Sequence, residues 1–359
     1  MLFSRRIADT QGPYLSTADD HKPDRVTKLV RNVPGRYHQR LTYSGNAGNT
    51  KKVSDSSLVS VVIPTRNRLA YLQQAIESAR AQNVEMELLV VDDASDAEVA
   101  QAIPPLLKPG ERLLRCNEAR GGAAARNVGL HQARGELVAF LDDDDIWLPG
   151  KLAAQMECMK RAGDNIVAVY CGYHYLQQET GKKFPAPPPR YRGNVHRVCL
   201  EHCITPTSTM LARRKALIDA GGFDECLPAG QDWDFWIRLS RLGDFDFVDQ
   251  DLVSLRVHGV QISGNLHRYI QARQRIIDKY AAEIQNDLAL QACHFHRLGV
   301  LYMLAGDSKR GRQLLSAACR HQLRLRYFTH LAVSLCPPLY RWLVSRFGMF
   351  RAGDTVFFH

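Results

Sequence analysis

Four consecutive aspartates, Asp142 to Asp145, are the strongest chemical feature of this 359-residue sequence. They follow directly on the apolar run at residues 137–141 and are closed by Ile146 and Trp147. Carboxylates packed this densely at the end of a buried strand repel one another, so they persist only where something cationic compensates them. The run therefore predicts a site for a divalent metal ion and a phosphorylated ligand.

Two further groups of polar residues follow apolar runs of strand length. Pro64 ends the run at residues 58–64 and is followed by Thr65 and Asn67. Asp93 comes after the run at residues 87–91. In open α/β sheets, ligands bind outside the carboxyl ends of the strands. We therefore expect these residues to share one binding edge with the aspartates.

From Leu58 onward, short apolar runs alternate with segments of helical length. This alternation is typical of βαβ units and predicts a parallel sheet with helices on both faces. The predicted strands cover 58–64, 87–91, 112–116, 136–141, 166–176 and 208–212, and the predicted helices cover 69–82, 97–107, 121–134, 149–161 and 232–242. A proline-rich loop is expected at 184–194, and the pattern after residue 266 is helical throughout.

Charge is distributed unevenly along the chain, which has a formal net charge of +10. Residues 1–57 carry +5, residues 58–265 carry −4 and residues 266–359 carry +9. We predict a loosely attached, disordered leader at 1–57, a catalytic domain at 58–265 and a basic helical extension at 266–359. The acidic middle of the chain argues against nucleic-acid binding. The basic, aromatic C-terminal part suits a membrane surface or an acidic partner. The alternative is that its helices dock on their own domain.

The nine cysteines are scattered through a chain whose first residues lack an apolar signal segment, which predicts reduced thiols and a cytoplasmic protein, associated with the inner face of the cell membrane if the C-terminal part binds lipid. His196, Cys199, His202 and Cys203 lie close in sequence, but their spacing is not that of a known zinc site, so a helix with buried thiols is the favoured interpretation.

Six motifs in order carry a resemblance to a known family. The segments SVVIPTRNR, VVDDASD, GGAAARNVGL, FLDDDDIW, GGFDE and QDWDFWIRL together resemble the family 2 inverting glycosyltransferases with the GT-A fold, over residues 58 to about 265. The resemblance implies an α/β, Rossmann-like, mixed and mainly parallel sheet with helices on both faces, followed by a C-terminal helical extension. It also implies a nucleoside diphosphate sugar as donor, UDP-linked in our expectation, and a hydroxyl of a glycan or lipid-linked acceptor in cell-surface polysaccharide synthesis.

By this resemblance the aspartate run contains the DxD element of the family. Asp142 should reach the ribose or the metal, Asp144 should be a ligand of Mn²⁺ or Mg²⁺, and Asp143 should belong to the nucleotide site. A hard cation held by one or two carboxylates and the phosphates would stabilise the leaving diphosphate. An acidic cap on the helix that follows explains one aspartate but not four.

The same resemblance gives the nucleotide site Pro64, Thr65, Asn67, Asp93 and Arg126. Asp93 is placed to accept the imide proton of a uracil, and Arg126 to meet the base or the phosphates. Each residue has a simpler alternative, since Asn67 can cap the next helix and Arg126 can pair with a nearby aspartate.

Asp232 is the expected general base, because an inverting transfer needs a carboxylate opposite the leaving group to take the proton of the acceptor hydroxyl. The family usually shows Glu-Asp here, whereas this chain has Gln231 and Asp232, with Asp234 as a less favoured competitor. His258 resembles a family histidine that completes the metal shell or touches a phosphate. The processive signature QxxRW is absent, which favours transfer of a single sugar.

Two other functions remain as alternatives. A sugar-phosphate nucleotidyltransferase would need a glycine-rich phosphate loop after the first strand, and PTRNRL lacks it. A non-catalytic glycan-binding protein on the same fold would be favoured by loss of the aspartates, all of which are present.

Overall fold

The computed structural model describes residues 58–257 and 266–347, with side chains to residue 343. All of them belong to one compact unit. The predicted leader at 1–57 and His258 lie outside the described residues, so the expectations for them stay predictions.

A nine-stranded mixed sheet forms the centre of this unit. Its strands lie in the spatial order β3 (Arg112–Arg115), β2 (Met86–Asp92), β1 (Val59–Thr65), β4 (Leu137–Phe140), β8 (Leu211–Arg213), β6 (Ile166–Gln177), β9 (Asp244–Val257) and β5 (Ile146–Trp147), while β7 (Lys183–Pro185) pairs with β6. The strands β3, β2, β1 and β4 are mutually parallel, so their carboxyl ends share one edge. β8 is antiparallel to β4 and to β6, whereas β6 and β9 are parallel.

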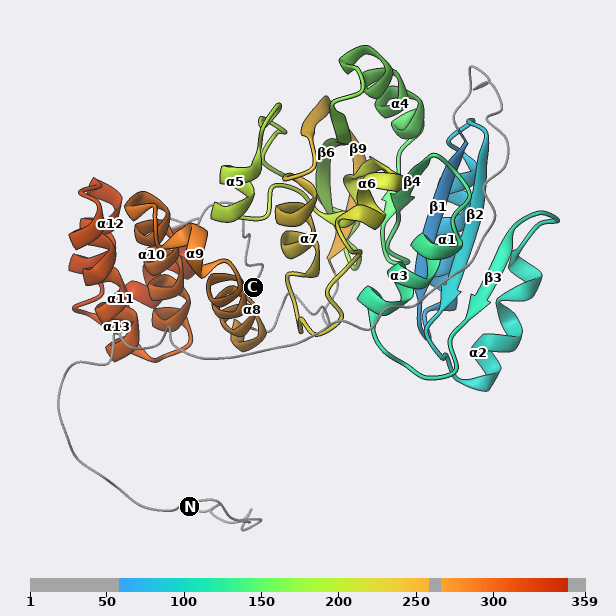
Figure 1. Cartoon of the computed structure of the whole chain (residues 1–359). Helices are drawn as coiled ribbons and strands as arrows, with labels where there is room; N and C mark the ends of the chain where they lie inside the picture. Colours follow the sequence, from blue (N-terminus) through green and yellow to red (C-terminus); the bar gives the residue numbers. More distant parts are fainter. Residues whose placement is uncertain (1–57, 258–265, 348–359) are drawn as a thin grey trace, which may run out of the picture. The chain divides into compact units, whose positions relative to one another are not determined.

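Helices cover both faces of the sheet, as predicted (Figure 1). One core cluster holds α1 (Leu69–Arg80) and α4 (Lys151–Ala162), and the other holds α3 (Gly122–Gln132), α5 (His196–Glu201), α6 (Arg214–Asp219) and α7 (Gln231–Leu239). The central strand β1 is buried throughout because its side chains alternate between these clusters, Val61 and Ile63 on one face and Val62 on the other.

Glycine at position 129 allows α3 to lie close against the sheet. A Cβ atom at Gly129 would meet Cγ1 of Val62 at 2.2 Å, which is far inside van der Waals contact. The close approach matters for function because α3 carries Arg126 and begins beside the binding edge.

The five helices predicted between residues 69 and 242 all differ from the structure at one end or both, and two of these differences have a clear local cause. The helix expected at 97–107 stops at Ala102 as α2 (Ala97–Ala102), and a 3₁₀ turn, Pro104–Leu106, follows because proline cannot continue an α-helix. The helix expected from Pro149 begins two residues later, after Gly150 in a left-handed conformation (φ 87°).

The C-terminal part is helical, as predicted, and packs on the sheet-containing part. It comprises α8 (Leu266–Lys279), α9 (Ala281–Ile284), α10 (Leu288–Leu304), α11 (Ser308–His321), α12 (Leu325–Val333) and α13 (Pro337–Phe347). The predicted helical pair joined at Gly306 and Asp307 is present as α10 and α11, with Asp307 accepting from the backbone N–H of Arg310. Lys279 of α8 pairs with Asp234 of α7 at 2.7 Å, and Nη1 of Arg297 on α10 donates to the carbonyl of Glu201 in α5.

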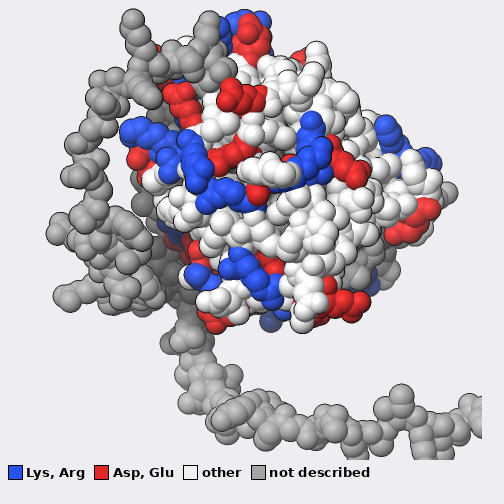
Figure 2. Space-filling view, turned by 90° about the vertical axis from the view of Figure 1, so that its right-hand side faces the viewer, with Lys and Arg blue, Asp and Glu red and all other residues white. Residues whose placement is uncertain are grey.

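Charges of both signs are interspersed on the face that carries β3 and α2 (Figure 2). Ion pairs such as Arg80 with Glu111 and Arg115 with Asp92 join strands and helices in this part of the chain. Within the described ranges, no helix is both long and apolar enough to span a bilayer.

Candidate functional site

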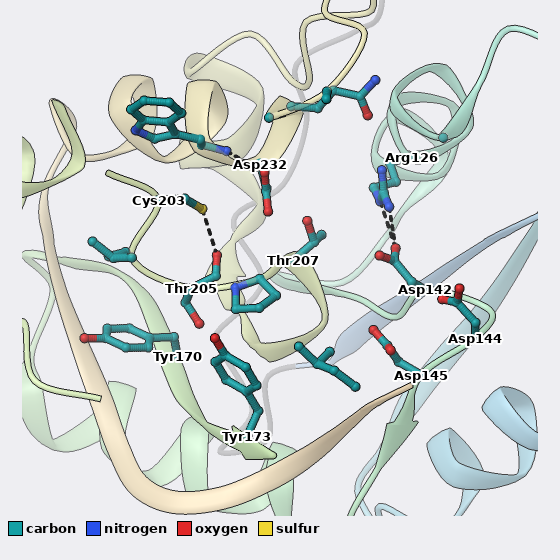
Figure 3. A pocket seen from close by; sticks show the side chains of 18 of the residues that line it. Arg126, Asp142, Asp144, Asp145, Tyr170, Tyr173, Cys203, Thr205, Thr207 and Asp232 are labelled. Atoms are coloured by element: carbon teal, nitrogen blue, oxygen red, sulfur yellow. Dashed lines mark hydrogen bonds and ion pairs between the residues drawn. The ribbon is translucent and has the colours of Figure 1, made fainter. Parts of the chain in front are cut away.

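A cavity of about 800 Å³ opens at the carboxyl ends of β1, β2 and β4. Its lining includes Pro64, Thr65, Asp93, Arg126, all four aspartates and Asp232, so the structure brings together nearly every residue that the sequence selects. Figure 3 shows the Asp232 side chain on one side of this space and Asp142 and Asp144 on the other. The two halves of the predicted chemistry therefore face one cavity.

Asp142 and Asp143 are each held by a cation and a hydroxyl-bearing neighbour. Arg126 forms an ion pair with the carboxylate of Asp142. The backbone N–H of Asp142 donates to Oγ of Ser208 at 3.1 Å. Asp143 accepts from Oγ1 of Thr65 at 2.7 Å and from Arg68 at 3.2 Å. Burial and the neighbouring Asp144 nevertheless raise the pKa of Asp143 to about 6.

Asp144 and Asp145 differ in their surroundings. Asp144 pairs with Arg68 at 2.8 Å and keeps part of its side chain exposed to the cavity. Asp145 is buried, accepts from Oγ of Ser208 at 2.6 Å and has its pKa raised by burial and by Asp144. Asp145 thus anchors the turn of the aspartate run, whereas Asp144 faces the cavity.

The charge balance of the aspartate run fits a bound cation. Two paired cations, Arg68 and Arg126, face the four carboxylates, and burial together with the neighbouring aspartate charges raises the pKa of Asp143 and of Asp145. Across the described ranges, no group of three or more His, Cys, Asp or Glu side chains is arranged as a complete metal shell. Such a partial donor set suits Mg²⁺ or Mn²⁺ held by one or two carboxylates together with ligand phosphates.

Asp93 and Asn67 follow neighbouring parallel strands but differ in exposure to the cavity. The Asp93 carboxylate lines the cavity and accepts from the backbone N–H groups of Arg120 and Gly121, at 2.9 and 2.8 Å. Asn67 does not line the cavity; its side chain exchanges two hydrogen bonds with Asp96, at 2.8 and 3.1 Å. Asn67, which has a positive φ of 56°, therefore links the loops after β1 and β2 instead of capping α1.

Asp232 is the second residue of α7. The helix begins at Gln231, directly after Gly230, which has a left-handed conformation (φ 70°). Burial raises the pKa of Asp232, against the opposing effects of a hydrogen bond from the backbone N–H of Trp233 and the positive charge of Arg126. A carboxylate with a raised pKa at the edge of a cavity is suited to accept a proton.

Asp234, the competitor for this role, is fully buried and has structural partners. Its carboxylate pairs with Arg238 and Lys279, each at 2.7 Å, and accepts from the hydroxyl of Tyr280 at 2.7 Å. Asp234 is absent from the cavity lining. It joins α7 to α8, which leaves Asp232 as the carboxylate available for chemistry.

The histidines and cysteines around α5 have other partners than a metal. His196 lies 3.0 Å from Oγ of Ser240 and 2.8 Å from Glu283, and Cys199 is buried in the core. Sγ of Cys203 donates to the carbonyl of Thr205 at 3.3 Å, beside Asp232 (Figure 3). The structure thus agrees with the favoured interpretation of a helix that carries a buried thiol.

Several lining residues were not selected from the sequence. Arg68 directly follows the PTRN segment and contacts both Asp143 and Asp144. The sequence predicts that a cation must compensate the aspartate run, but it does not identify Arg68 as that cation. Arg256 lies two residues before His258, and its backbone N–H donates to the Asp145 carboxylate. Tyr269, Arg273 and Arg297 come from α8 and α10, and no local motif marks them.

Comparisons with known proteins identify the family of this chain. The model of the family described as "Glycosyl transferase family 2" matches residues 60–221. An uncharacterized glycosyltransferase of Rickettsia typhi is 30% identical over 217 residues, which cover 59% of this chain and 67% of that protein. One of Methanocaldococcus jannaschii is 30% identical over 213 residues, covering 56% and 72%. The chain spans only about a third of some other relatives, for example 36% of an uncharacterized glycosyltransferase of Rickettsia felis.

Solved structures share the fold. The S. aureus protein TarS in complex with UDP-GlcNAc superposes with a TM-score of 0.55 at 17% identity, covering 81% of this chain and 91% of that one. The mannosyltransferase PcManGT from Pyrobaculum calidifontis, in complex with GDP-Man and Mn²⁺, gives a TM-score of 0.50 at 19% identity, with coverages of 81% and 88%. The GT-A fold, the family model and the relatives lead to one conclusion. This chain belongs to glycosyl transferase family 2.

Proposed function

We propose that the protein transfers one sugar, with inversion, from a nucleoside diphosphate sugar to a hydroxyl of a glycan or lipid-linked acceptor in cell-surface polysaccharide synthesis. The observation that carries the proposal is the placement of Asp232 and the aspartate run on opposite sides of one cavity (Figure 3). Inverting transfer needs this separation, because the acceptor oxygen attacks the sugar from the face opposite the leaving group.

Asp232 takes the proton of the acceptor hydroxyl in this scheme. Its raised pKa makes it a better proton acceptor than an ordinary exposed aspartate. The positive charge of Arg126 favours the ionised form of Asp232, and Arg126 also pairs with Asp142 at the donor side. Both side chains are half-buried and line the cavity.

A divalent cation fits the donor side, with Asp144 and Asp142 as the residues that would hold it. When bound, the cation supplies a Lewis acid that neutralises charge on the departing diphosphate. Asp143 and Asp145 support the run from behind through Thr65 and Ser208. His258, the third expected ligand, stays a prediction because it lies outside the described residues.

A uridine nucleotide is the donor we favour. Asp93 lines the cavity with its carboxylate held by two backbone N–H groups, so the oxygens keep lone pairs for the imide N–H of a uracil. Pro64 and Thr65 continue the same edge. A structure of similar fold contains UDP-GlcNAc, although another contains GDP-Man.

The C-terminal helices present a basic and apolar surface, for which we propose contact with an anionic membrane. Between residues 308 and 353 the chain has nine Lys and Arg and no Asp or Glu. The exposed apolar side chains on this part are Leu323, Leu325, Phe328, Leu335, Leu339 and Trp342. Charge complementarity with anionic lipid and insertion of apolar side chains act together in such surfaces. The protein would then act at the inner face of the cell membrane.

The test of the catalytic proposal is nucleoside diphosphate release across a panel of donors with Mn²⁺ or Mg²⁺. We expect release with a UDP-sugar, and loss of about 10³-fold or more in Asp232→Asn, since the proton acceptor is removed. Asp144→Ala should lose both activity and the thermal stabilisation by UDP with Mn²⁺. Asp164→Asn, at a fully exposed carboxylate, is the matched control. Wild-type rates in Asp232→Asn would refute the assignment, and a nucleotidyltransferase would instead release pyrophosphate from a nucleoside triphosphate.

A further inference from the structure

The cavity is lined by cations other than those that pair with the four aspartates. Two of them are Arg273 of α8 and Arg297 of α10. Neither arginine contacts the aspartate run, and both come from the C-terminal helices. This second positive region is not needed by the donor chemistry described above.

Arg273 and Asp232 line the same cavity and are connected through Trp233 and Tyr269. Its guanidinium stacks over the ring of Trp233, 4.4 Å from the ring centroid, and Trp233 directly follows Asp232 in α7. Tyr269, one turn before Arg273 on α8, is close enough to both Asp232 and Arg273 for each charge to affect its pKa. A group bound by Arg273 would therefore lie in the same cavity as Asp232.

The positive charge of Arg273 has no carboxylate partner within the described residues. Its Nη1 donates to Nδ1 of His294 at 3.2 Å, and His294 in turn donates from Nε2 to the carbonyl of Leu200 at 3.0 Å. His294 is thus a neutral ring that orients the guanidinium without compensating it. Burial and the charge of Arg297 lower the pKa of Arg273 to about 9.

Arg297 adds a second, nearly buried cation behind Arg273. Its Nη1 donates to the carbonyl of Glu201 at 2.9 Å, and its Nη2 lies 4.0 Å from the Glu201 carboxylate. That carboxylate is shared with Arg197 at 3.5 Å, and Nε of Arg297 has no hydrogen-bond partner in the described part of the chain. Positive charge therefore exceeds negative charge in this region.

We propose that Arg273, supported by Arg297, binds an anionic group, a phosphate or a carboxylate, that the acceptor carries near the hydroxyl receiving the sugar. A guanidinium binds either oxyanion through two parallel hydrogen bonds, which fixes orientation as well as position. This inference rests on the proposed function only in naming the ligand an acceptor. It identifies the acceptor class as an anionic glycan or a phosphate-linked one.

The test is calorimetric titration of the full chain saturated with UDP and Mn²⁺, so that the donor phosphate site is already filled. The probes are glucose 6-phosphate, glucuronate and glucose. We expect at least one anionic sugar to bind at least about 10-fold more tightly than glucose, and the two anionic probes separate phosphate from carboxylate recognition. Equal binding of all three sugars, or no binding of either anionic sugar, would overturn the proposal.

Variants of α8 locate the site. Arg273→Met keeps an apolar contact with Trp233 and should weaken binding of the anionic sugar about 10- to 100-fold, whereas Arg273→Lys should retain part of it. Arg275→Met, on the exposed side of the same helix, should bind like the wild type. Unchanged binding in Arg273→Met would contradict the proposal. Because titration needs no turnover, absence of diphosphate release would refute the proposed function without affecting this result.

Discussion

The two aspartates of α7 show how one short segment separates chemistry from stability. Asp232 faces the cavity with a raised pKa, whereas Asp234, two residues later, is buried among Arg238, Lys279 and Tyr280. Helical geometry explains the division, because residues two apart point to different sides of the helix. Substitutions at the two positions should therefore have different consequences.

Asp232 should give the reaction a pH dependence on its acidic side. The base must be ionised, and burial raises its pKa, so kcat/KM should fall as the pH decreases through a value above the ordinary 3.8 of an aspartate. Asp232 binds its proton more strongly in the folded state than in the unfolded state. This group therefore contributes stability at low pH, and the contribution is lost as the pH rises through the folded pKa. A pH profile of diphosphate release, measured with excess donor and metal, checks the expectation. An acid limb at pH 4 or below would contradict it.

Asp234→Ala should destabilise the fold by about 1–3 kcal/mol, because it removes the buried carboxylate that Arg238, Lys279 and the hydroxyl of Tyr280 contact. The measurement is the free energy of unfolding from urea titration. Asp232→Asn serves as the comparison and should be near neutral or slightly stabilising, since it removes a buried charge whose ionised form is disfavoured. Equal stability of Asp234→Ala and the wild type would show that the joint between α7 and α8 is unimportant.

At the scale of elements, the close packing of α3 on β1 positions Arg126. We expect Gly129→Ala to cost about 1–3 kcal/mol, because the new methyl group would overlap Val62. To relieve the overlap, α3 would have to move away from β1. This movement would displace Arg126, one turn earlier on the helix, and weaken UDP binding in a thermal-shift assay. Combining Gly129→Ala with Val62→Ala should restore part of both losses. Failure of the double variant to recover would place the cause elsewhere.

How far the sequence reaches depends on whether a residue acts locally. The aspartate run, Asp93 and Asp232 are found from the sequence, because each follows a strand or begins a helix whose end is fixed by the sheet. Asn67 is misjudged in detail, since its partner Asp96 lies on the loop after a neighbouring strand, which only the paired parallel strands bring near. Arg273 is beyond sequence reasoning, because its place in the cavity depends on the docking of α8.

At the scale of the whole molecule, the basic C-terminal surface predicts binding to anionic vesicles. Replacing Leu325 and Trp342, which are 82% and 54% exposed, with Ser should reduce co-sedimentation with phosphatidylglycerol vesicles several-fold. Neutral phosphatidylcholine vesicles should bind weakly, and added salt should weaken the binding to anionic vesicles. Diphosphate release in solution should not change, because neither residue lines the cavity. Equal sedimentation of variant and wild type would refute the membrane contact.

The order of the cavity's walls along the chain has a consequence for how such enzymes diversify. Residues 64 to 145 line the side of the aspartate run, and residues 170 to 297 supply the rest of the lining. Under the proposed function, a chimera that exchanges the later half should take a new acceptor and keep its donor. The ion pair between Asp234 and Lys279 limits which piece can be exchanged, because α7 and α8 must be replaced together.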